Sequence, residues 1–338
     1  MLKMRLTALV GSVAVVVLVF GAAIVGATPR ATPITAALIS DIGKFNDRSF
    51  NQSQLEGLNR AKAQLGVNVL PLQSNSSSDY LPNLTTAVHK NANLIVAAGF
   101  LLAGAEGTVA QQFPNIDFAI TDDSVNGGDF KGKSTKNIEG LTYASNEAGC
   151  LVGYLAAEMV KKHGGKQVIG AVGGIKIPPV DNYIVGYKYC AKIADPGITV
   201  LVNYSQDFNA QDKCKTVAVN QIGQGSQAEF QVAGSCGLGA LSAAAQAGIW
   251  GIGVDKDQYN DAKHILTSAI KRVDVGVYDV VKQVKDGTFK GNSDLLFNLK
   301  NGGIGVGKIA PSVPALFIAK MNALKAKIIA GTLKVPSA

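Results

Sequence analysis

Histidine and cysteine are scarce in this sequence, and their scarcity limits the chemistry that the chain can perform. Three histidines and four cysteines occur among 338 residues, and no two cysteines have the C-x-x-C spacing. A zinc site is therefore not expected. His89, His163 and His264 are not accompanied by a G-x-S-x-G nucleophile elbow, so no catalytic triad can be assembled. We expect a protein that is not an enzyme and that uses no cofactor.

Long blocks of like charge are also missing, which argues against nucleic acid as a partner. The formal net charge is +8, but the lysines are spread along the chain. Attraction to a membrane surface fits this distribution as well as a specific anionic partner does. A DNA-binding regulator would need a helix-turn-helix ahead of its ligand-binding part, and an apolar segment occupies that place.

This apolar segment predicts export. Lys3 and Arg5 precede a run from Leu6 to Ala27 that contains no charged residue. We interpret residues 1–27 as a signal peptide cleaved after Ala27, with an uncleaved N-terminal anchor as the alternative because the run approaches the length of a membrane helix. Both interpretations place the rest of the chain in the periplasm or at the outer face of the cell membrane. No cysteine follows the run, so retention at the membrane would depend on an anchor or on a membrane partner.

The cysteines, although few, are an even number in a chain that we expect to be exported. Oxidation is possible outside the cytoplasm, and two disulfides are conceivable there. The sequence leaves their pairing open, and buried free thiols are the alternative. The residues concerned are Cys150, Cys190, Cys214 and Cys236.

A Pro-rich linker is absent as well, although the chain exceeds the size at which single cores stop growing. From Thr35 onward, short apolar runs alternate with amphipathic segments, which predicts an α/β fold of parallel sheets covered on both faces. Strands are expected at 35–41, 67–72, 94–98, 117–121, 138–144, 168–172, 199–204, 229–233, 250–254 and 265–269. Helices are expected at 49–65, 82–90, 103–112, 147–162, 180–193, 211–221, 238–247, 275–285 and 313–329. Two similar lobes in tandem, with several crossings between them, would form a hinge and a ligand cleft at the carboxyl ends of the strands.

Polar side chains gather in the loop that follows the first predicted strand. Asn46, Asp47 and Asn51 lie there together with Phe45 and Phe50. Helix capping by Asp47 or Ser49 explains part of this composition. A pocket for a flat polar ring explains more of it, because such a ring needs an aromatic stacking face and partners at its edge. We therefore favour a binding role for this loop.

Two further loops follow predicted strands in the second half of the chain. Gly234 and Ser235 form a Gly-rich turn that opens a helix, a geometry that lets backbone N–H groups approach a ligand. Phe230 lies just upstream and points either into the cleft or into the core. Asp255 ends a strand where a carboxylate can accept two sugar hydroxyls. Lys271 follows the next strand and could reach the same hydroxyls, although a surface lysine is the simpler interpretation.

One apparent nucleotide-binding motif is rejected on its context. Residues 127–134 match the P-loop pattern G-x-x-x-x-G-K-S. A P-loop leads directly into a helix whose N-terminus holds phosphate, whereas residues 135–144 indicate a loop and a strand. Asp129 would also place negative charge beside the phosphate. Nucleotide hydrolysis is therefore not expected.

Taken together, several short segments resemble the basic membrane protein family of bacterial substrate-binding proteins, whose best understood members are purine nucleoside receptors of ABC importers. The likeness covers nearly the whole chain after the leader. Its segments are Asn46–Asn51, Ala119–Asp123, Glu147 with Gly153–Leu155, Gly173–Pro178, Gln231–Gly234, Gly253–Gln258 and Thr267–Asp274.

The resemblance implies a type I periplasmic-binding fold, two Rossmann-like lobes joined by three crossings. The first lobe would comprise residues 34–142 plus 256–292, and the second would comprise residues 143–255 plus 293–335. Phe50 and Phe230 would stack on the purine. Hydrogen bonds to the purine edge would come from Asn46, Asp47 and Asp123. The ribose would be held by Asp255, Lys271, Gly234 and Ser235, although the family usually has two glycines where Gly234 and Ser235 stand.

We therefore interpret the chain as an extracytoplasmic solute receptor that closes on a purine nucleoside and presents it to an ABC transporter permease. A receptor of the same fold for a sugar or another small polar solute is the first alternative. An enzyme that processes nucleosides on the same lobes is a less favoured one.

Overall fold

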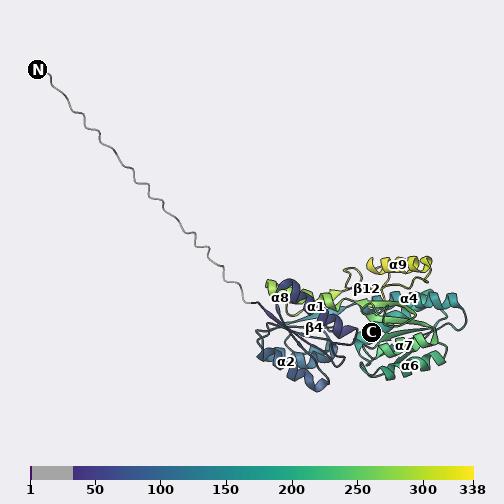
Figure 1. Cartoon of the computed structure of the whole chain (residues 1–338), viewed down its shortest axis with the longest axis horizontal. Coiled ribbons are helices and arrows are strands. Elements are labelled where there is room, and N and C mark those ends of the chain that lie inside the picture. The colour runs from purple at the N-terminus through teal and green to yellow at the C-terminus, as the bar shows by residue number, and fades with distance from the viewer. Residues whose placement is uncertain (2–32) are drawn as a thin grey trace. The chain divides into compact units, whose positions relative to one another are not determined.

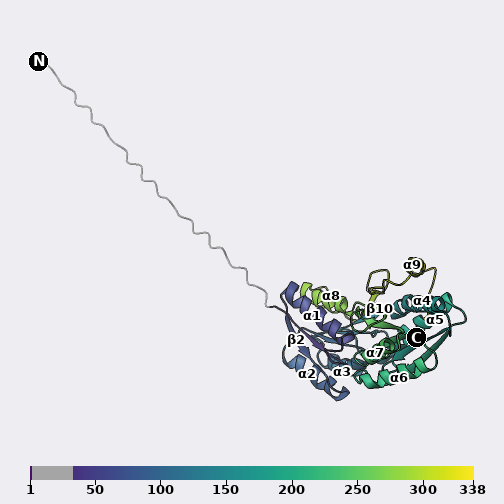
Figure 2. The same cartoon turned by 45° about the vertical axis from the view of Figure 1, so that its right-hand side comes forward.

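The computed structural model describes Met1 and residues 33–338, which Figures 1 and 2 show as two groups of helices and strands. The predicted signal peptide or anchor at residues 1–27 lies outside the described residues, apart from Met1. Within the described part of the chain, no helix is both long and apolar enough to span a bilayer.

The first lobe is built on a parallel sheet of six strands in the order β11-β5-β4-β3-β1-β2. Apolar residues fill the central strands because both faces of a parallel sheet are covered. Helices α1 and α8 pack on one face, and α2 and α3 pack on the other. Pro71 has no backbone N–H to donate. It lies in β2, which is an edge strand, where proline is tolerated in a sheet. The elements are β1 (Thr35–Ile39), α1 (Phe50–Leu65), β2 (Asn68–Leu72), α2 (Tyr80–His89), β3 (Leu94–Ala97), α3 (Ala103–Gln112), β4 (Asp117–Thr121), β5 (Ile138–Tyr143), α8 (Val273–Asp286) and β11 (Ser293–Phe297).

The second lobe repeats this plan around the strand order β12-β10-β9-β8-β6-β7. Its strands are parallel except β12, which pairs antiparallel with β10. Helices α4 and α5 pack on one face, whereas α6 and α7 cover the other. Helix α9 lies over α4 (Figure 1). The elements are α4 (Ser145–His163), β6 (Val168–Gly173), α5 (Pro178–Ala194), β7 (Thr199–Tyr204), α6 (Gln211–Gly223), β8 (Ala228–Val232), α7 (Gly237–Ala247), β9 (Trp250–Asp255), β10 (Ile265–Lys271), β12 (Ile304–Val306) and α9 (Ala315–Ile329).

The chain crosses between the lobes three times, after β5, after β10 and after β11. The crossings lie side by side and are joined by backbone hydrogen bonds. Ala144 N–H donates to Phe297 O at 2.9 Å, and Arg272 N–H donates to Gly303 O at 2.9 Å. The rings of Tyr143 and Phe297 stack with centroids 4.8 Å apart. The predicted three crossings are thus present.

Two segments lie in the other lobe from the one that we predicted. β10 falls within residues 256–292, assigned to the first lobe, but it pairs with β9 in the second sheet. β11 falls within residues 293–335, assigned to the second lobe, but it pairs with β5 in the first sheet. The predicted lobe boundaries are wrong at these strands. Strand pairing is a long-range contact, and apolar periodicity identifies a strand without naming its neighbour.

All four cysteines are paired, and both disulfides lie in the second lobe. Cys150 in α4 is bonded to Cys190 in α5. Cys214 in α6 is bonded to Cys236, the residue before α7. The alternative of buried free thiols is therefore wrong.

At the rejected P-loop match, a short 3-10 turn (Gly128–Phe130) is followed by β5 and not by a helix.

Candidate functional site

A cavity lies between the lobes at the carboxyl ends of their strands, where open α/β sheets bind ligands. The empty space, counted with the solvent at its mouth, is about 560 Å³. The first lobe contributes Asp41, Gly43, Asp47, Phe50, Asn51, Gly99, Phe100, Leu101 and Asp122. The second lobe contributes Ile177, Pro179, Val180, Tyr183, Phe208, Val232, Ala233, Gly234, Val254, Asp255 and Lys271.

Asp47 shapes the first wall by capping α1. Its carboxylate accepts hydrogen bonds from the backbone N–H groups of Ser49 at 2.9 Å, Asn51 at 2.8 Å and Gln52 at 3.0 Å. The Asn51 side-chain amide adds a fourth bond at 3.1 Å. The carboxylate is thereby occupied by the protein. Asn46, for which a ligand contact was predicted, is exposed and does not line the cavity, whereas Asp47 lines it and caps α1.

Asp41 is a cavity residue that the sequence interpretation missed. Its Oδ1 accepts hydrogen bonds from Gly43 N–H and from Asn51 Nδ2, each at 2.7 Å. No described residue donates to its Oδ2. Burial raises the pKa of Asp41 to about 7, although the bonds from Gly43 and Asn51 act to lower it. Asp41 ended a predicted strand, and its place at the strand's carboxyl end was the signal that could have identified it.

A buried ion triad joins the two lobes at the floor of the cavity. Lys271 Nζ lies 2.5 Å from Asp122 Oδ2 and 3.4 Å from Asp255 Oδ1. The exposed fraction is 3% for the Lys271 side chain and 7% for each carboxylate. Burial alone would lower the pKa of Lys271, but the facing carboxylates raise it. Lys271 therefore remains a cation between two acids, and the simpler interpretation as a surface lysine is wrong.

Asp255 connects this triad to both lobes. It accepts a hydrogen bond from Ser49 Oγ at 2.6 Å on its Oδ2 and one from Tyr183 O–H at 3.3 Å on its Oδ1. Asp122 directly follows β4, and Asp255 ends β9, which occupies the equivalent place in the second sheet. Both residues have a positive φ of 61°. Such a conformation is uncommon for residues other than glycine, and here it turns each carboxylate toward Lys271.

Asp122, and not the predicted Asp123, is the acid of this loop that lines the cavity. Asp123 Oδ1 accepts a hydrogen bond from Ser124 N–H at 2.8 Å. Its side chain instead lines a neighbouring hollow that also contains Asp122 and Phe100. Both residues lie in the loop after β4, where the positive φ of Asp122 directs its side chain toward the cavity and that of Asp123 toward the neighbouring hollow.

Of the two phenylalanines predicted to stack on the ligand, only Phe50 lies at the cavity. Phe50 lines the cavity, and Lys271 Nζ lies 4.7 Å from its ring centroid. Phe230 is fully buried and packs on Tyr187 with ring centroids 5.0 Å apart. Phe230, predicted to stack on the ligand, therefore does not line the cavity. Val232, two residues later on the same face of β8, reaches the cavity in its place.

The Gly-rich turn contributes one of its two predicted residues to the cavity wall. Gly234 has a φ of 56° and lines the cavity, whereas Ser235 does not. Phe208, on the neighbouring loop of the second lobe, also lines the cavity and had no predicted role. Val232, Phe208 and Val180 give the second lobe a largely apolar wall.

The composition of the wall limits the ligand class. Three acids of the first lobe and Asp255 face a single cation, Lys271, so an anionic ligand would meet net negative charge. A neutral, flat molecule with hydrogen-bonding groups fits better. Within residues 33–338, no group of three or more His, Cys, Asp or Glu side chains is placed to hold a metal ion.

Residues 34–338 match the family described as ABC transporter substrate-binding protein PnrA-like, or Bmp. The chain belongs to the Bmp family. It is 33% identical to the ABC transporter nucleoside-binding protein BmpA of Lactococcus lactis, over 90% of each chain. Identity is also 33% to a CD4+ T-cell-stimulating antigen of Listeria monocytogenes, with 89% of this chain and 88% of the relative covered.

Solved structures agree with this membership. An ABC transporter solute-binding protein of Aeropyrum pernix superposes with a TM-score of 0.81 at 25% identity, covering 90% of this chain and 94% of that one. The type I periplasmic-binding fold and the Bmp family predicted from the sequence are thus confirmed. This Bmp protein is a substrate-binding protein of an ABC transporter.

Proposed function

We propose that this Bmp protein is an extracytoplasmic receptor that binds one purine nucleoside between its lobes and delivers it to an ABC permease. One arrangement carries the proposal. The Phe50 ring and the free Oδ2 of Asp41 lie in the same cavity as the buried triad of Asp122, Lys271 and Asp255. A stacking face with an edge partner suits a base, and the triad suits ribose hydroxyls.

In this proposal the base stacks on Phe50, with the apolar side chains of Val232 and Phe208 on its other face. Asp41 accepts a hydrogen bond from a ring N–H or an amino group of the base, or donates one when it is protonated. Asp255 and Lys271 bind the ribose hydroxyls, and the backbone at Gly234 adds a close contact. Asn46, Asp123, Phe230 and Ser235 have no ligand contact here.

Closure of the cleft supplies the signal that the permease reads. Asn209 Nδ2 donates to Ile42 O across the cleft at 2.7 Å. At the rim, Arg48 Nη1 lies 3.1 Å from Asp261 Oδ1 of the other lobe. A ligand that contacts both lobes stabilises this closed form relative to an open one. The net charge of +8 favours a location near an anionic membrane surface, where the permease lies.

Thermal unfolding with candidate ligands, followed by chromatography of the ligand, tests the proposal. Inosine, adenosine or guanosine should raise the unfolding temperature and be recovered intact. A shift with a monosaccharide and with no nucleoside would favour the sugar receptor. Release of free base would favour the enzyme. The absence of any nucleoside effect at millimolar concentration would contradict the proposed ligand.

A further inference from the structure

The disulfide between Cys214 and Cys236 lies beside the ligand cavity. Cys214 is in the first turn of α6, and Cys236 directly precedes α7. Both helices begin at the carboxyl ends of strands, the edge of the sheet that faces the cleft, and both cysteines are fully buried. The bond therefore joins two segments that border the cavity.

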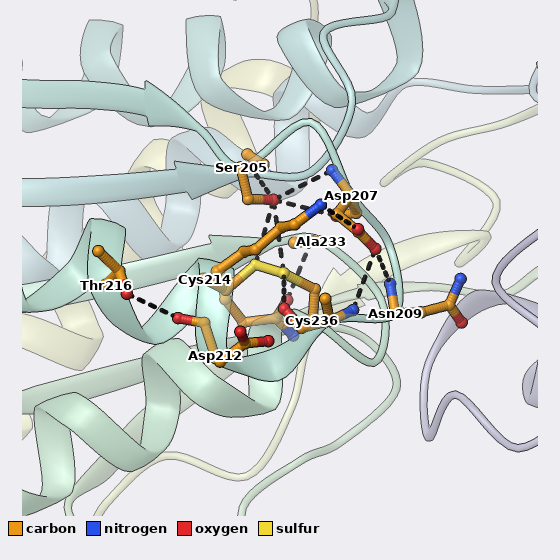
Figure 3. The surroundings of a disulfide bond; sticks show 12 residues. Ser205, Asp207, Asn209, Asp212, Cys214, Thr216, Ala233 and Cys236 are labelled. Carbon is orange, nitrogen blue, oxygen red and sulfur yellow. Dashed lines mark hydrogen bonds and ion pairs between the residues drawn. A yellow bond between two sulfur atoms is a disulfide. The ribbon is translucent and has the colours of Figure 1, made fainter.

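Residues 205–210, which we call the 205–210 loop, wrap around this bond. Ser205 Oγ lies 3.3 Å from Cys214 Sγ and 3.4 Å from Cys236 Sγ (Figure 3). Cys236 N–H donates to Phe208 O at 3.0 Å. The disulfide and the backbone beside it thus hold the loop at two points, one on each side of Asp207.

The same loop provides one side chain of the cavity wall and one hydrogen bond between the lobes. Phe208 lines the cavity, and Asn209 makes the hydrogen bond to Ile42 O of the first lobe. Gly234, two residues before Cys236, lines the cavity as well. The disulfide therefore connects one wall of the cavity to a bond that closes the cleft.

Local hydrogen bonds shape the loop but do not tie it to the Gly-rich turn. Asp207 Oδ1 accepts the N–H groups of Asn209 at 2.8 Å and Ala210 at 3.0 Å, and its Oδ2 lies 2.8 Å from Lys213 Nζ. These bonds cap α6 from within the same segment. The loop is joined to the turn before α7 by hydrogen bonds of Cys236 and by contacts with the disulfide.

We propose that the Cys214–Cys236 disulfide is a positioning element of the ligand site, which holds the 205–210 loop and the turn at Gly234 in the arrangement that retains ligand. The inference rests on the proposed function for the identity of the ligand. A preorganised wall lowers the cost of ordering on binding, and its loss acts mainly on the dissociation rate.

The other disulfide provides a matched control in the same lobe. Cys150 and Cys190 join α4 to α5, and neither they nor their chain neighbours line the cavity. The cysteines are 40 residues apart in sequence, against 22 for Cys214 and Cys236. A longer closed loop contributes at least as much to stability in the chain-entropy view. Removing the Cys150–Cys190 disulfide therefore shows how much ligand affinity changes when the lobe is only destabilised.

The experiment compares the double variants C214A/C236A and C150A/C190A with the wild-type protein, using inosine as the probe. We expect C214A/C236A to bind inosine about tenfold more weakly, chiefly through faster dissociation, and C150A/C190A to stay within about twofold of wild type. Equal affinities for C214A/C236A and wild type would overturn the inference. So would failure of C214A/C236A to fold where C150A/C190A folds, because the bond would then serve the whole lobe.

Hydrogen exchange without ligand supplies a second readout that is independent of the proposed function. Amides of the 205–210 loop should exchange faster in C214A/C236A than in wild type, and remain unchanged in C150A/C190A. Unchanged loop exchange in C214A/C236A would contradict the positioning role. If wild type binds no inosine while the loop still responds in this way, the proposed ligand is wrong and the positioning role stands.

Discussion

The two lobes share one topology but give unlike walls to the cavity between them. The first lobe presents Asp41, Asp47 and Asp122 with the Phe50 ring. The second presents mainly apolar side chains, with Asp255 and Lys271 at its floor. In the described residues, both disulfides belong to the second lobe, whereas the first relies on hydrogen bonds that converge on the Asp47 carboxylate.

This difference suggests that the first lobe mainly selects the ligand and that the second mainly shields it from water. Hydrogen-bond acceptors with fixed directions select a ligand by the pattern of its donors, and the first lobe supplies most of them. An apolar wall excludes water and strengthens the polar contacts opposite to it. The second lobe supplies that wall and also the cation that neutralises part of the acidic charge.

Replacing the two phenylalanines in turn should give the largest effects, and opposite ones. Phe230→Ala empties a fully buried site in the second lobe and should lower the free energy of unfolding by about 4 kcal/mol. Nucleoside affinity of the folded protein should change little. Phe50→Ala should instead weaken binding by roughly tenfold to a hundredfold, the range for loss of a base-stacking ring, with a smaller loss of stability.

Urea unfolding and titration calorimetry on the two phenylalanine variants check this pair. If Phe230→Ala lost much of its nucleoside affinity but kept its stability, Phe230 would have to contact the ligand. The account of how the two lobes differ would then be wrong.

Removing the cation that links the lobes should have the next largest effect. Lys271→Met leaves Asp122 and Asp255 buried against each other, and loss of one partner from a buried ion pair costs about 3 kcal/mol or more. The deficit should shrink at pH 5 relative to pH 8, because protonation relieves the repulsion between the acids. Urea unfolding at both pH values measures it.

Lys282→Met is the control for the cation, since Lys282 and Asp286 form an exposed pair on α8. No measurable change is expected there. A Lys271→Met protein as stable as wild type at pH 8 would show that the triad is not charged as described.

The pH dependence should distinguish a cavity acid from a core acid. Burial raises the pKa of Asp41 to about 7 and that of Glu229, in β8, to about 8. For each group the folded state binds a proton more tightly than the unfolded chain, so its contribution to stability falls as the pH rises from about 4 to the raised pKa. Asp41→Asn and Glu229→Gln should each reduce the loss of unfolding free energy over this pH range by roughly 2 kcal/mol.

Ligand binding separates these two acids. Only Asp41 lines the cavity, so only Asp41→Asn should change how nucleoside affinity depends on pH between 5 and 8. Calorimetric titrations at several pH values test this. The same change in Glu229→Gln would mean that the core of the second lobe responds to the ligand.

The smallest effect is expected at the rim. Arg48 pairs with Asp261 across the cleft, but its side chain is 60% exposed. Exposed ion pairs contribute between 0 and about 1 kcal/mol, so Arg48→Ala should weaken nucleoside binding by about threefold or less. High salt should abolish the difference. A tenfold loss that persists in salt would move part of the recognition from the cavity to its rim.

Most of the fold could be predicted from the sequence, because it follows from local periodicity. The expected strands and helices correspond to observed ones, with β4, β7 and α3 matching in their bounds. β11 and β12 were missed because they are only five and three residues long, and because the residues between them, 298–303, include two asparagines and two glycines. The sheet that each of β10 and β11 joins depends on contacts distant in sequence, which periodicity does not encode.

The loops that line the cavity could be predicted from the sequence, but not every side chain that faces it. Loops at the carboxyl ends of strands were identified correctly, and Phe50, Asp255, Lys271 and Gly234 line the cavity as expected. The displacement from Asp123 to Asp122 is a question of side-chain direction, whereas Phe230 and Val232 share a face of β8 and differ in how far along the strand they lie. Direction is set by where a strand ends and by the local φ, as at Asp122, and composition does not carry that information.

Titration calorimetry of the wild-type protein with inosine and with inosine 5′-monophosphate tests the central claim most directly. The account predicts that one inosine binds per chain and is recovered intact, and that the added phosphate of the monophosphate abolishes or strongly weakens binding at the acidic cavity. Absence of binding by inosine, or equal binding of both compounds, would contradict it.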